Sequence, residues 1–260
     1  MTPKKYLFFD IDGTLLAGGY RPADVPASAA LALKKLREAG HFLAIATGRS
    51  EAMASGVFRA LGFENMVSDG GYGLTLNGKL LGIRPLPKED VVALIHECDA
   101  LGFPWGLQTD NTDTRITPDE RFLAFTNDEY IKTRIIPGLK PEDPPILYKA
   151  YVACTFPDEK KLKTLARLPW CRFHKEYFFV EPAAKGEGIK QMMKLLHAPL
   201  EDVIVFGDSL NDLSMFQDDW TKVAMGNAAP ELKAAADLVT TDVDKDGIYN
   251  ACLTLGLIAQ

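Results

Sequence analysis

The sequence predicts an α/β protein whose parallel-sheet core is interrupted by a smaller α+β domain. Two observations support this fold class. Short apolar strands alternate with helices near both ends of the chain, which is typical of a parallel sheet covered on both faces. Between them the pattern changes to hairpin and antiparallel signals. We place the core at 1–84 and 182–260, and the inserted domain at 85–181.

Two strand–helix pairs open the core. An apolar strand over 5–9 precedes a helix that begins at Pro26 and stops at Gly40, and a strand over 41–46 precedes a helix over 50–61. The apolar face expected of the first helix consists of Leu31, Leu33, Leu36 and Ala39. Short loops between such pairs favour parallel pairing of the strands.

The middle of the chain has different signals. Asn77-Gly78, between short apolar runs within 72–83, predicts a hairpin. A helix is expected over 88–101, and the polar, Pro-rich stretch after it, up to 146, is expected to be irregular. The buried face of that helix should consist of Val91, Leu94, Ile95 and Cys98. Two strands and an intervening helix complete the insert, at 147–156, 170–180 and 158–168 respectively.

The strand–helix pattern returns at Lys185, where a helix with one apolar face is expected to begin. That face has the spacing i, i+3, i+4 and i+7, and its residues are Ile189, Met192, Met193 and Leu196. Three short strands and one more helix follow, at 203–206, 223–225, 238–240 and 231–236 respectively. These elements return the chain to the parallel sheet.

The composition is that of an ordinary globular protein, with 47% hydrophobic and 25% charged residues. Lys and Arg number 29 and Asp and Glu 35, a net charge of −6, so no electrostatic footprint for nucleic acid exists. No apolar run is long enough to cross a bilayer or to form a signal peptide. The four cysteines form no C-x-x-C pair, which favours reduced thiols. We expect a cytoplasmic protein with no nucleic acid or membrane partner and no evident protein partner.

Polar motifs follow four predicted strands of the core. They are Asp10-Ile11-Asp12-Gly13-Thr14, Thr47-Gly48-Arg49, Ser68-Asp69-Gly70-Gly71 and Gly207-Asp208-Ser209-Leu210-Asn211-Asp212. Ligands of open α/β sheets bind at the carboxyl ends of the strands, so Asp10, Asp12, Asp208 and Asp212 should converge there. Because clustered carboxylates repel one another, a divalent cation is expected between them. Oxygen ligands alone favour Mg²⁺ over zinc.

Such a site suits phosphoryl transfer. The cation would neutralise phosphate oxygens, and backbone N–H groups of the Gly13-Thr14 turn could cradle them. One carboxylate can act as the nucleophile and form an aspartyl-phosphate. A second carboxylate, two residues later, can protonate the leaving oxygen and then activate the water that cleaves the intermediate. Asp10 and Asp12 have the spacing for these two roles.

Over nearly its whole length the chain resembles the haloacid dehalogenase-like hydrolases, and among them the Cof-type sugar-phosphatase branch. Four motifs stand in that family's order: DxDGT from Asp10, Thr47 after a strand, Lys185-Gly186 at a helix start, and GDxxND from Gly207. The resemblance implies a Rossmann-like core with an inserted α+β cap domain. It also implies a small phosphorylated metabolite as substrate.

The resemblance also implies roles for individual residues. Asp10 would be the nucleophile and Asp12 the general acid/base, while Thr47 and Lys185 would hold the phosphate. Mg²⁺ would be bound by the Asp10 carboxylate, the Asp12 backbone carbonyl and Asp208, supported by Asn211 and Asp212. The residues assigned to substrate binding are Gly13, Thr14, Gly48, Asp69 and Gly70. Arg49 stays open between a site role and an ion pair on a helix surface.

Two features modify this assignment. Only 35 positions separate Asp12 from Thr47, but 138 separate Thr47 from Lys185, so the cap must follow the second motif. Mutases of the phosphoglucomutase kind carry their cap in the first gap, which argues against that activity. Asp69 stands where many Cof-type relatives have asparagine, so an acidic group facing the substrate could change which leaving groups are accepted.

We therefore predict a Mg²⁺-dependent phosphomonoesterase acting on small phosphorylated metabolites such as sugar phosphates. One alternative is a phosphoryl transferase or mutase that uses the same intermediate. Another is a non-catalytic regulator that binds a phosphorylated ligand. The presence of Asp10, Asp12, Lys185 and Asp208 together argues against the regulator, because a protein without catalysis has no physical need for this acidic cluster.

Overall fold

The computed structural model describes residues 3–18, 24–126, 131–172 and 174–259. The chain divides into two compact units. The core unit comprises Met1–Arg49, Ala54–Gly82 and Ala184–Gln260, and the cap unit comprises Ser50–Met53 and Ile83–Ala183. Among the described residues, no helix combines the length and the apolar character that a membrane span requires.

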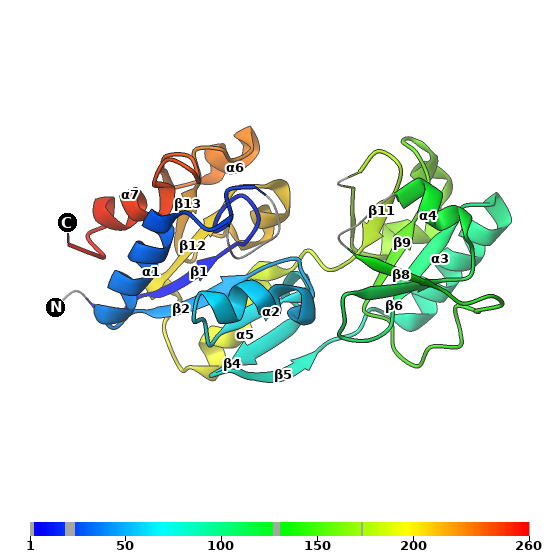
Figure 1. Ribbon diagram of the computed structural model, residues 1–260, viewed down its shortest axis with the longest axis horizontal. Helices are drawn as coiled ribbons and strands as arrows, with labels where there is room; N and C mark the ends of the chain where they lie inside the picture. The colour runs from blue at the N-terminus through cyan, green and yellow to red at the C-terminus, as the bar shows by residue number, and fades with distance from the viewer. Residues whose placement is uncertain (1–2, 19–23, 127–130, 173, 260) are drawn as a thin grey trace. The chain divides into compact units, whose positions relative to one another are not determined.

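The core unit is built on one eight-stranded sheet in the order β14-β13-β12-β1-β2-β3-β4-β5 (Figure 1). The strands are β1 (Tyr6–Phe9), β2 (Phe42–Ala46), β3 (Met66–Ser68), β4 (Gly73–Leu76), β5 (Lys79–Ile83), β12 (Val203–Gly207), β13 (Thr221–Ala224) and β14 (Leu238–Val239). The six from β14 to β3 pair in parallel, and β4 runs antiparallel to β3. The predicted parallel-sheet core is confirmed.

The predicted hairpin joins β4 to β5, which lie side by side at one edge of this sheet. Asn77 and Gly78 form its turn with φ angles of 51° and 73°. Two consecutive positive φ angles match a two-residue turn whose twist suits antiparallel strands, and Asn-Gly is the pair that adopts it at least cost.

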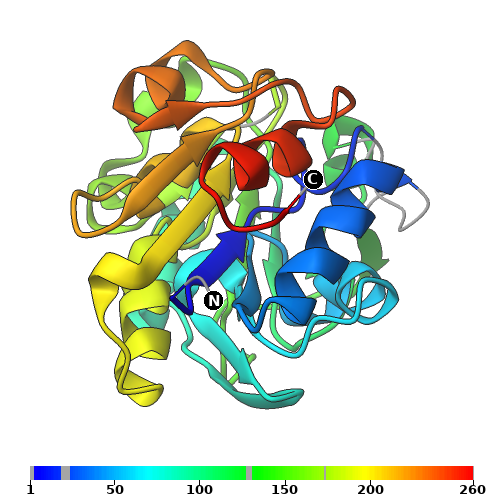
Figure 2. The same cartoon turned by 90° about the vertical axis from the view of Figure 1, so that its left-hand side faces the viewer.

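Helices cover both faces of the core sheet. They are α1 (Ala27–Glu38), α2 (Glu51–Ala60), α5 (Lys185–Leu195), α6 (Pro230–Ala235) and α7 (Gly247–Thr254). Successive strand residues point to opposite faces, so Leu7 and Phe9 of β1 pack on the α1 and α7 side, and Phe8 packs on the α5 side. Figure 2 shows α1 and α7 side by side on one face and α5 on the other. Two apolar layers thereby bury the strands that carry the polar motifs.

In the core unit, helix positions agree with the sequence pattern, apart from the face of α1. Leu31 is 45% exposed and Ala39 lies past the end of the helix, so both assignments to the core were wrong. The buried residues are Ala29, Ala32, Leu33 and Leu36. Residues two positions apart in a helix point about 200° apart, so Leu31 and Leu33 could not share a face. In α5, by contrast, Ile189, Met192 and Met193 are buried as predicted.

The cap unit contains a six-stranded sheet in the order β10-β11-β9-β6-β7-β8. Its strands are β6 (Trp105–Gln108), β7 (Thr114–Thr117), β8 (Lys132–Ile135), β9 (Lys149–Val152), β10 (Trp170–Cys171) and β11 (Phe178–Val180). All neighbours are antiparallel except β7 and β8. The α-helices are α3 (Lys88–Leu101) and α4 (Arg121–Thr126), and the predicted apolar face of α3 is buried.

Three cap predictions were wrong in detail. The stretch before 146, expected to be irregular, contains β6, β7, α4 and β8. The helix expected over 158–168 is two short 3₁₀ helices, η3 (Asp158–Lys161) and η4 (Lys163–Arg167). Buried leucines recur every third residue there, at Leu162, Leu165 and Leu168, which matches the three residues per turn of a 3₁₀ helix. The strand over 170–180 is the antiparallel pair β10 and β11.

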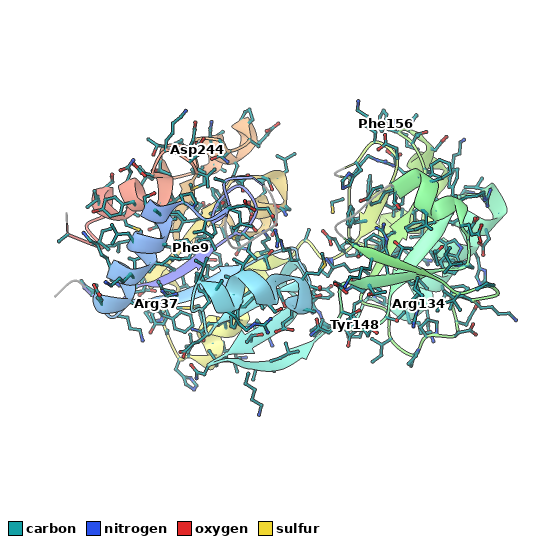
Figure 3. The ribbon with its side chains drawn as sticks, viewed as in Figure 1. Phe9, Arg37, Arg134, Tyr148, Phe156 and Asp244 are labelled. Atoms are coloured by element: carbon teal, nitrogen blue, oxygen red, sulfur yellow. The ribbon has the colours of Figure 1, made fainter. Side chains whose placement is uncertain are left out.

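Side chains follow the expected division between interior and surface. Figure 3 places Phe9 inside the core unit, whereas Arg37 of α1 and Asp244 lie at its surface. Asp244 belongs to the turn that precedes α7. In the cap unit, Phe156 is 66% exposed.

Candidate active site

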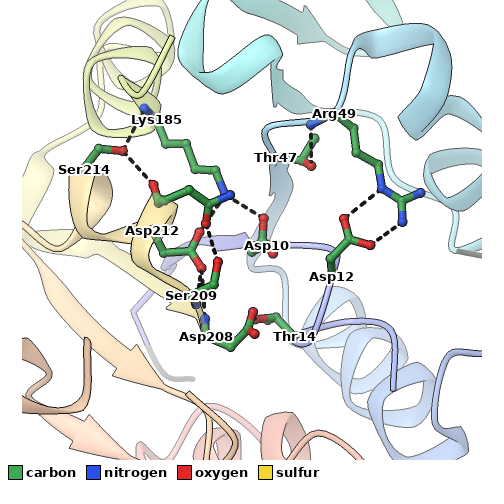
Figure 4. Close-up of polar contacts among 11 residues, drawn as sticks. Asp10, Asp12, Thr14, Thr47, Arg49, Lys185, Asp208, Ser209, Asp212 and Ser214 are labelled. Carbon is green, nitrogen blue, oxygen red and sulfur yellow. Dashed lines mark hydrogen bonds and ion pairs between the residues drawn. The ribbon is translucent and has the colours of Figure 1, made fainter. Parts of the chain in front are cut away.

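Three parallel strands deliver the polar motifs to one end of the core sheet. Asp10 follows β1, Thr47 follows β2 and Asp208 follows β12, and β1 pairs with both of the other strands. Lys185 is the first residue of α5. Figure 4 shows these side chains gathered at the carboxyl ends of the strands.

Lys185 joins two aspartates in the interior of the site. Its Nζ donates to Asp10 Oδ1 and to Asp212 Oδ1, both at 2.6 Å, and its side chain is 1% exposed. Burial lowers the pKa of Lys185, but the attraction of the two carboxylates outweighs it and the pKa is raised. Lys185 therefore supplies a permanent positive charge rather than a base.

The environment of Asp10 disfavours its ionised form. Burial raises its pKa well above the usual value of a carboxyl group, and Asp212 raises it further, while Lys185 opposes both. Asp208 and Asp12 also raise the pKa of Asp10. A carboxylate among other carboxylates is held ionised only by added positive charge, so the site favours a bound cation.

Asp208 contacts the turn that follows Asp10. Its Oδ1 accepts a hydrogen bond from Thr14 Oγ1 at 3.1 Å. Gly13 has φ of +80°, and a Cβ placed on it would lie 2.1 Å from Asp208 Oδ2. Glycine is therefore required here both by its backbone conformation and by the close approach of Asp208. Burial and then the charge of Asp212 raise the pKa of Asp208 to about 7.

The turn itself differs from the expected phosphate cradle. The Gly13 N–H donates to Leu16 O at 3.1 Å, and the Thr14 N–H donates to Ile11 O at 3.4 Å. The Thr14 hydroxyl donates its hydrogen bond to Asp208. These groups stabilise the turn and the position of Asp208 in this structure.

The carboxylates fit a divalent cation. One oxygen each of Asp10, Asp208 and Asp212 lies within 4.8 Å of the others. Both oxygens of Asp212 are occupied, Oδ1 by Lys185 and Oδ2 by the N–H groups of Asp208 and Ser209 at 2.9 and 3.0 Å. Asp10 and Asp208 are therefore the carboxylates best placed to bind the ion. With all three carboxyl groups ionised, three negative charges against one ammonium would leave a double negative charge, and oxygen donors alone suit Mg²⁺.

The GDxxND motif is held together by a capping box. The Ser209 side chain accepts from the backbone of Asp212, and the Asp212 side chain accepts from the backbone of Ser209. Asn211 Oδ1 accepts from Ser209 Oγ at 2.5 Å. Asp212 and Asn211 thus support the loop that presents Asp208. Ser209 was assigned no role from the sequence, although the S-x-x-D spacing from Ser209 to Asp212 is a capping signal.

Asp12 lies apart from this cluster and pairs with Arg49 (Figure 4). Arg49 Nε donates to Asp12 Oδ2 at 2.9 Å, and Nη2 donates to Asp12 Oδ1. The Arg49 side chain is 5% exposed and that of Asp12 is 45% exposed. The Arg49 backbone N–H donates to Thr47 Oγ1 at 3.1 Å. Arg49 is therefore a buried residue of the site and not a residue of a helix surface.

The loop after β3 connects the other motifs. Asp69 N–H donates to Arg49 O at 2.8 Å, Gly70 N–H to Thr47 O at 3.1 Å, and Ala184 N–H to Gly70 O at 2.7 Å. Asp69 is 3% exposed, and its Oδ2 accepts from Ser68 Oγ at 2.8 Å. These contacts hold Asp69 within the loop that joins the motifs, and its role in substrate binding stays a prediction.

The raised pKa of Asp208 predicts a specific pH dependence of stability. The folded state holds the proton up to about pH 7, whereas an unfolded Asp releases it near 3.8. The folded state therefore binds more protons between these values, and its stability relative to the unfolded state falls as pH rises. We expect the free energy of unfolding of the metal-free protein, minus that of Asp208→Asn, to fall from about pH 4 to about pH 7 and then level off. Urea unfolding at four pH values measures it, and a flat difference would contradict the raised pKa.

Comparison of this chain with protein families, curated proteins and solved structures agrees with these motifs. The sequence model of one family, described as haloacid dehalogenase-like hydrolase, matches residues 7–252. The chain belongs to this family. It is 31% identical over 260 residues to the protein named "Putative phosphatase YkrA" of Bacillus subtilis (strain 168), covering 98% of each chain. The family resemblance inferred from the four motifs is confirmed.

Solved structures of similar proteins share this fold over nearly the whole chain. A hypothetical protein from Geobacillus kaustophilus HTA426 is 34% identical, with a TM-score of 0.83 over 98% of this chain and 100% of that one. The sugar phosphatase BT4131, of subclass IIB of the superfamily, is 27% identical, with a TM-score of 0.79 over 98% of this chain and 100% of that one. The α/β core with an inserted cap is therefore the architecture of this family.

Proposed function

We propose that this protein is a Mg²⁺-dependent phosphatase that hydrolyses phosphate monoesters of small metabolites through an aspartyl-phosphate intermediate. The observation that carries the proposal is Asp10: a buried carboxylate held by Lys185, beside Asp208, with Asp12 two residues away. Sugar phosphates are the proposed substrate class. The similarity to the sugar phosphatase BT4131 over the whole chain supports this class.

Each residue has a defined task in the proposed reaction. An Asp10 oxygen attacks phosphorus, and the bond from phosphorus to the ester oxygen breaks as the Asp10–phosphorus bond forms. Asp12 gives its proton to the leaving oxygen. In the second step Asp12 takes a proton from water, whose oxygen attacks the aspartyl-phosphate and releases phosphate and Asp10. Atoms and charge balance with water as the only co-substrate.

We assign the binding of the phosphoryl group to Lys185 and Thr47. A lysine ammonium has three N–H donors, and two of those of Lys185 are directed at Asp10 and Asp212. The third is available to a phosphoryl oxygen. Thr47 Oγ1 accepts from the Arg49 N–H, which leaves its O–H as a donor. Mg²⁺ held by Asp10 and Asp208 would neutralise the negative charge of the phosphoryl group.

Metal removal is expected to abolish the activity. We would measure phosphate release from a broad panel of phosphorylated metabolites with Mg²⁺, with a chelator, and with Mg²⁺ restored in excess. The expected result is release that falls at least about 10²-fold with chelator and returns with Mg²⁺, because the acidic cluster would otherwise repel the anionic substrate. The preferred compound would identify the substrate.

Two other outcomes would separate the alternatives. Release that continues with chelator would contradict the role of the metal. If folded protein with Mg²⁺ releases no phosphate from any compound, the phosphatase proposal fails. Transfer to an added acceptor would then indicate a transferase, and ligand binding without turnover would indicate a regulator.

A further inference from the structure

The two aspartates of the DxD motif each have a separate cationic partner. Asp10 pairs with Lys185, which is 175 positions away, and Asp12 pairs with Arg49, 37 positions away. Figure 4 shows Asp10 directed toward Lys185 and Asp12 toward Arg49. The family resemblance assigns Lys185 but leaves Arg49 without a role, so the second pair requires its own explanation.

Arg49 holds both oxygens of the Asp12 carboxylate. Its Nε and Nη2 donate to Oδ2 and Oδ1 respectively, which is the two-pronged geometry that a planar guanidinium makes with a carboxylate. Two parallel hydrogen bonds define the plane of the carboxylate as well as its position. A single lysine ammonium could define neither in the same way, because it acts as a point charge.

Arg49 is itself held rigidly. Its side chain is 5% exposed, and its backbone N–H and C=O bond to Thr47 Oγ1 and to the Asp69 N–H. Asp12, by contrast, has a side chain that is 45% exposed, and it lies in the loop after β1, where it forms a single β-bridge with Leu16. The buried arginine therefore provides the fixed partner, and the more exposed aspartate is positioned by it. Ion pairs in which both partners are exposed have no such effect.

We propose that Arg49 is a positioning residue that acts on the reaction only through Asp12. This inference rests on the proposed function, in which Asp12 is the general acid. Proton transfer requires the protonated carboxyl group within about 2.6–3.2 Å of the leaving oxygen, so a carboxyl group free to rotate would transfer its proton less often. The proton sits on one Asp12 oxygen, which keeps a lone pair for one Arg49 N–H, while the other oxygen accepts from the second. Arg49 removes that rotation. Under this proposal Arg49 does not contact the phosphoryl group.

The choice of leaving group tests the proposal. An alkyl phosphate loses an alkoxide, a strong base that needs the proton of Asp12 as its bond to phosphorus breaks. p-Nitrophenyl phosphate loses a stable phenolate that needs no proton. The ratio kcat/KM covers the steps up to formation of the aspartyl-phosphate, so it reports the acid step without the later step that both substrates share.

We would measure kcat/KM of Arg49→Met on both substrates, using as the alkyl phosphate the best sugar phosphate from the panel. The expected loss is about 10²-fold on the sugar phosphate and less than about tenfold on p-nitrophenyl phosphate. Arg49→Lys should lie between wild type and Arg49→Met, because it keeps the charge without the two-pronged contact. Arg59→Met in α2 is the matched control and should change neither ratio.

A double-mutant cycle tests whether Arg49 affects kcat/KM through Asp12. If Arg49 acts only through Asp12, then Arg49→Met should cause no further loss of kcat/KM in an Asp12→Asn background. Losses that multiply, or losses equal on the two substrates, would overturn the proposal in favour of direct substrate contact or general structural damage. Thermal unfolding of each variant identifies misfolding, and Arg49→Gln replaces any variant that fails to fold.

The controls keep this inference distinct from the proposed function. If wild-type protein hydrolyses neither substrate, or if Asp10→Asn remains active, the proposed function fails and this inference fails with it. If wild-type hydrolysis is present and depends on Asp10, but Arg49→Met shows no preference between the leaving groups, only the inference about Arg49 fails.

Discussion

Asp10→Asn is expected to lower kcat for phosphate release by at least about 10⁴-fold, the scale of loss when a catalytic nucleophile is removed. The amide of asparagine cannot form the acyl-phosphate bond, although it has almost the same shape as the carboxyl group. Folding should be retained or improved. Burial raises the pKa of Asp10, which means that its charge is costly in the folded state, and the substitution removes that charge.

The measurement is single-turnover and steady-state phosphate release by wild type and variant, together with thermal unfolding of both. Asp244→Asn is the matched control, since Asp244 is exposed in the turn before α7, and its activity should equal that of wild type. An Asp10→Asn protein that keeps more than about one part in a hundred of the wild-type kcat would assign the nucleophile elsewhere.

Lys185→Met is expected to reduce both activity and stability. Activity should fall at least about 10³-fold, because the positive charge that binds the phosphoryl group and Asp10 is lost. Stability at neutral pH should fall by about 3–5 kcal/mol, the range for removing one partner of a buried ion pair. Lys185 is 1% exposed between Asp10 and Asp212, so water cannot replace its charge.

This loss of stability should depend on pH. Lys185 lowers the pKa of Asp10 in the wild type, and without it that pKa rises further. The folded variant then holds a proton over a wider pH range than the unfolded chain does, so its stability falls as pH rises. Destabilisation should therefore be larger at pH 8 than at pH 5. Urea unfolding at both values measures it.

Lys194→Met is the matched control for that experiment. Lys194 lies on the same helix, in the last turn of α5, and is exposed. A surface substitution of this kind should change the free energy of unfolding by no more than about 0.5 kcal/mol at either pH. Equal destabilisation of Lys185→Met at the two pH values would show that the loss comes from packing and not from charge.

The core elements were predictable because their sequence patterns are strong. Parallel strands covered on both faces are continuous apolar runs, as in β1 and β12, and the i, i+3, i+4 spacing identifies α5. The cap strands β6, β7 and β8 lack such patterns. In β7, Arg115 is fully buried, with its guanidinium 4.8 Å from the ring centre of Phe122 and 5.0 Å from that of Tyr151. A charged residue that packs as an aromatic partner conceals a strand from any analysis of hydrophobic alternation.

The same division applies to the candidate site. Asp10, Asp12, Thr47, Lys185 and Asp208 could be identified because each lies in a motif at the end of a strand or the start of a helix. The pairing of each carboxylate with its cation could not be identified from the sequence. The motif contains two aspartates and the chain contains 29 basic side chains, and spacing along the chain does not state which cation reaches which carboxylate. The hydrogen bond from Ser68 to Asp69 could not be predicted for the same reason.

The sequence by itself determined the family, the parallel core and the residue types that can carry phosphoryl transfer, because these follow from short motifs and local periodicity. Only the tertiary structure decided that Lys185 holds Asp10, that Arg49 holds Asp12, and that Asp212 supports Lys185 and the Asp208 loop instead of remaining open to a ligand. The physical reason is that hydrogen bonds and ion pairs depend on distances of about 3 Å between atoms, and those distances arise only when strands far apart in the chain pair in one sheet.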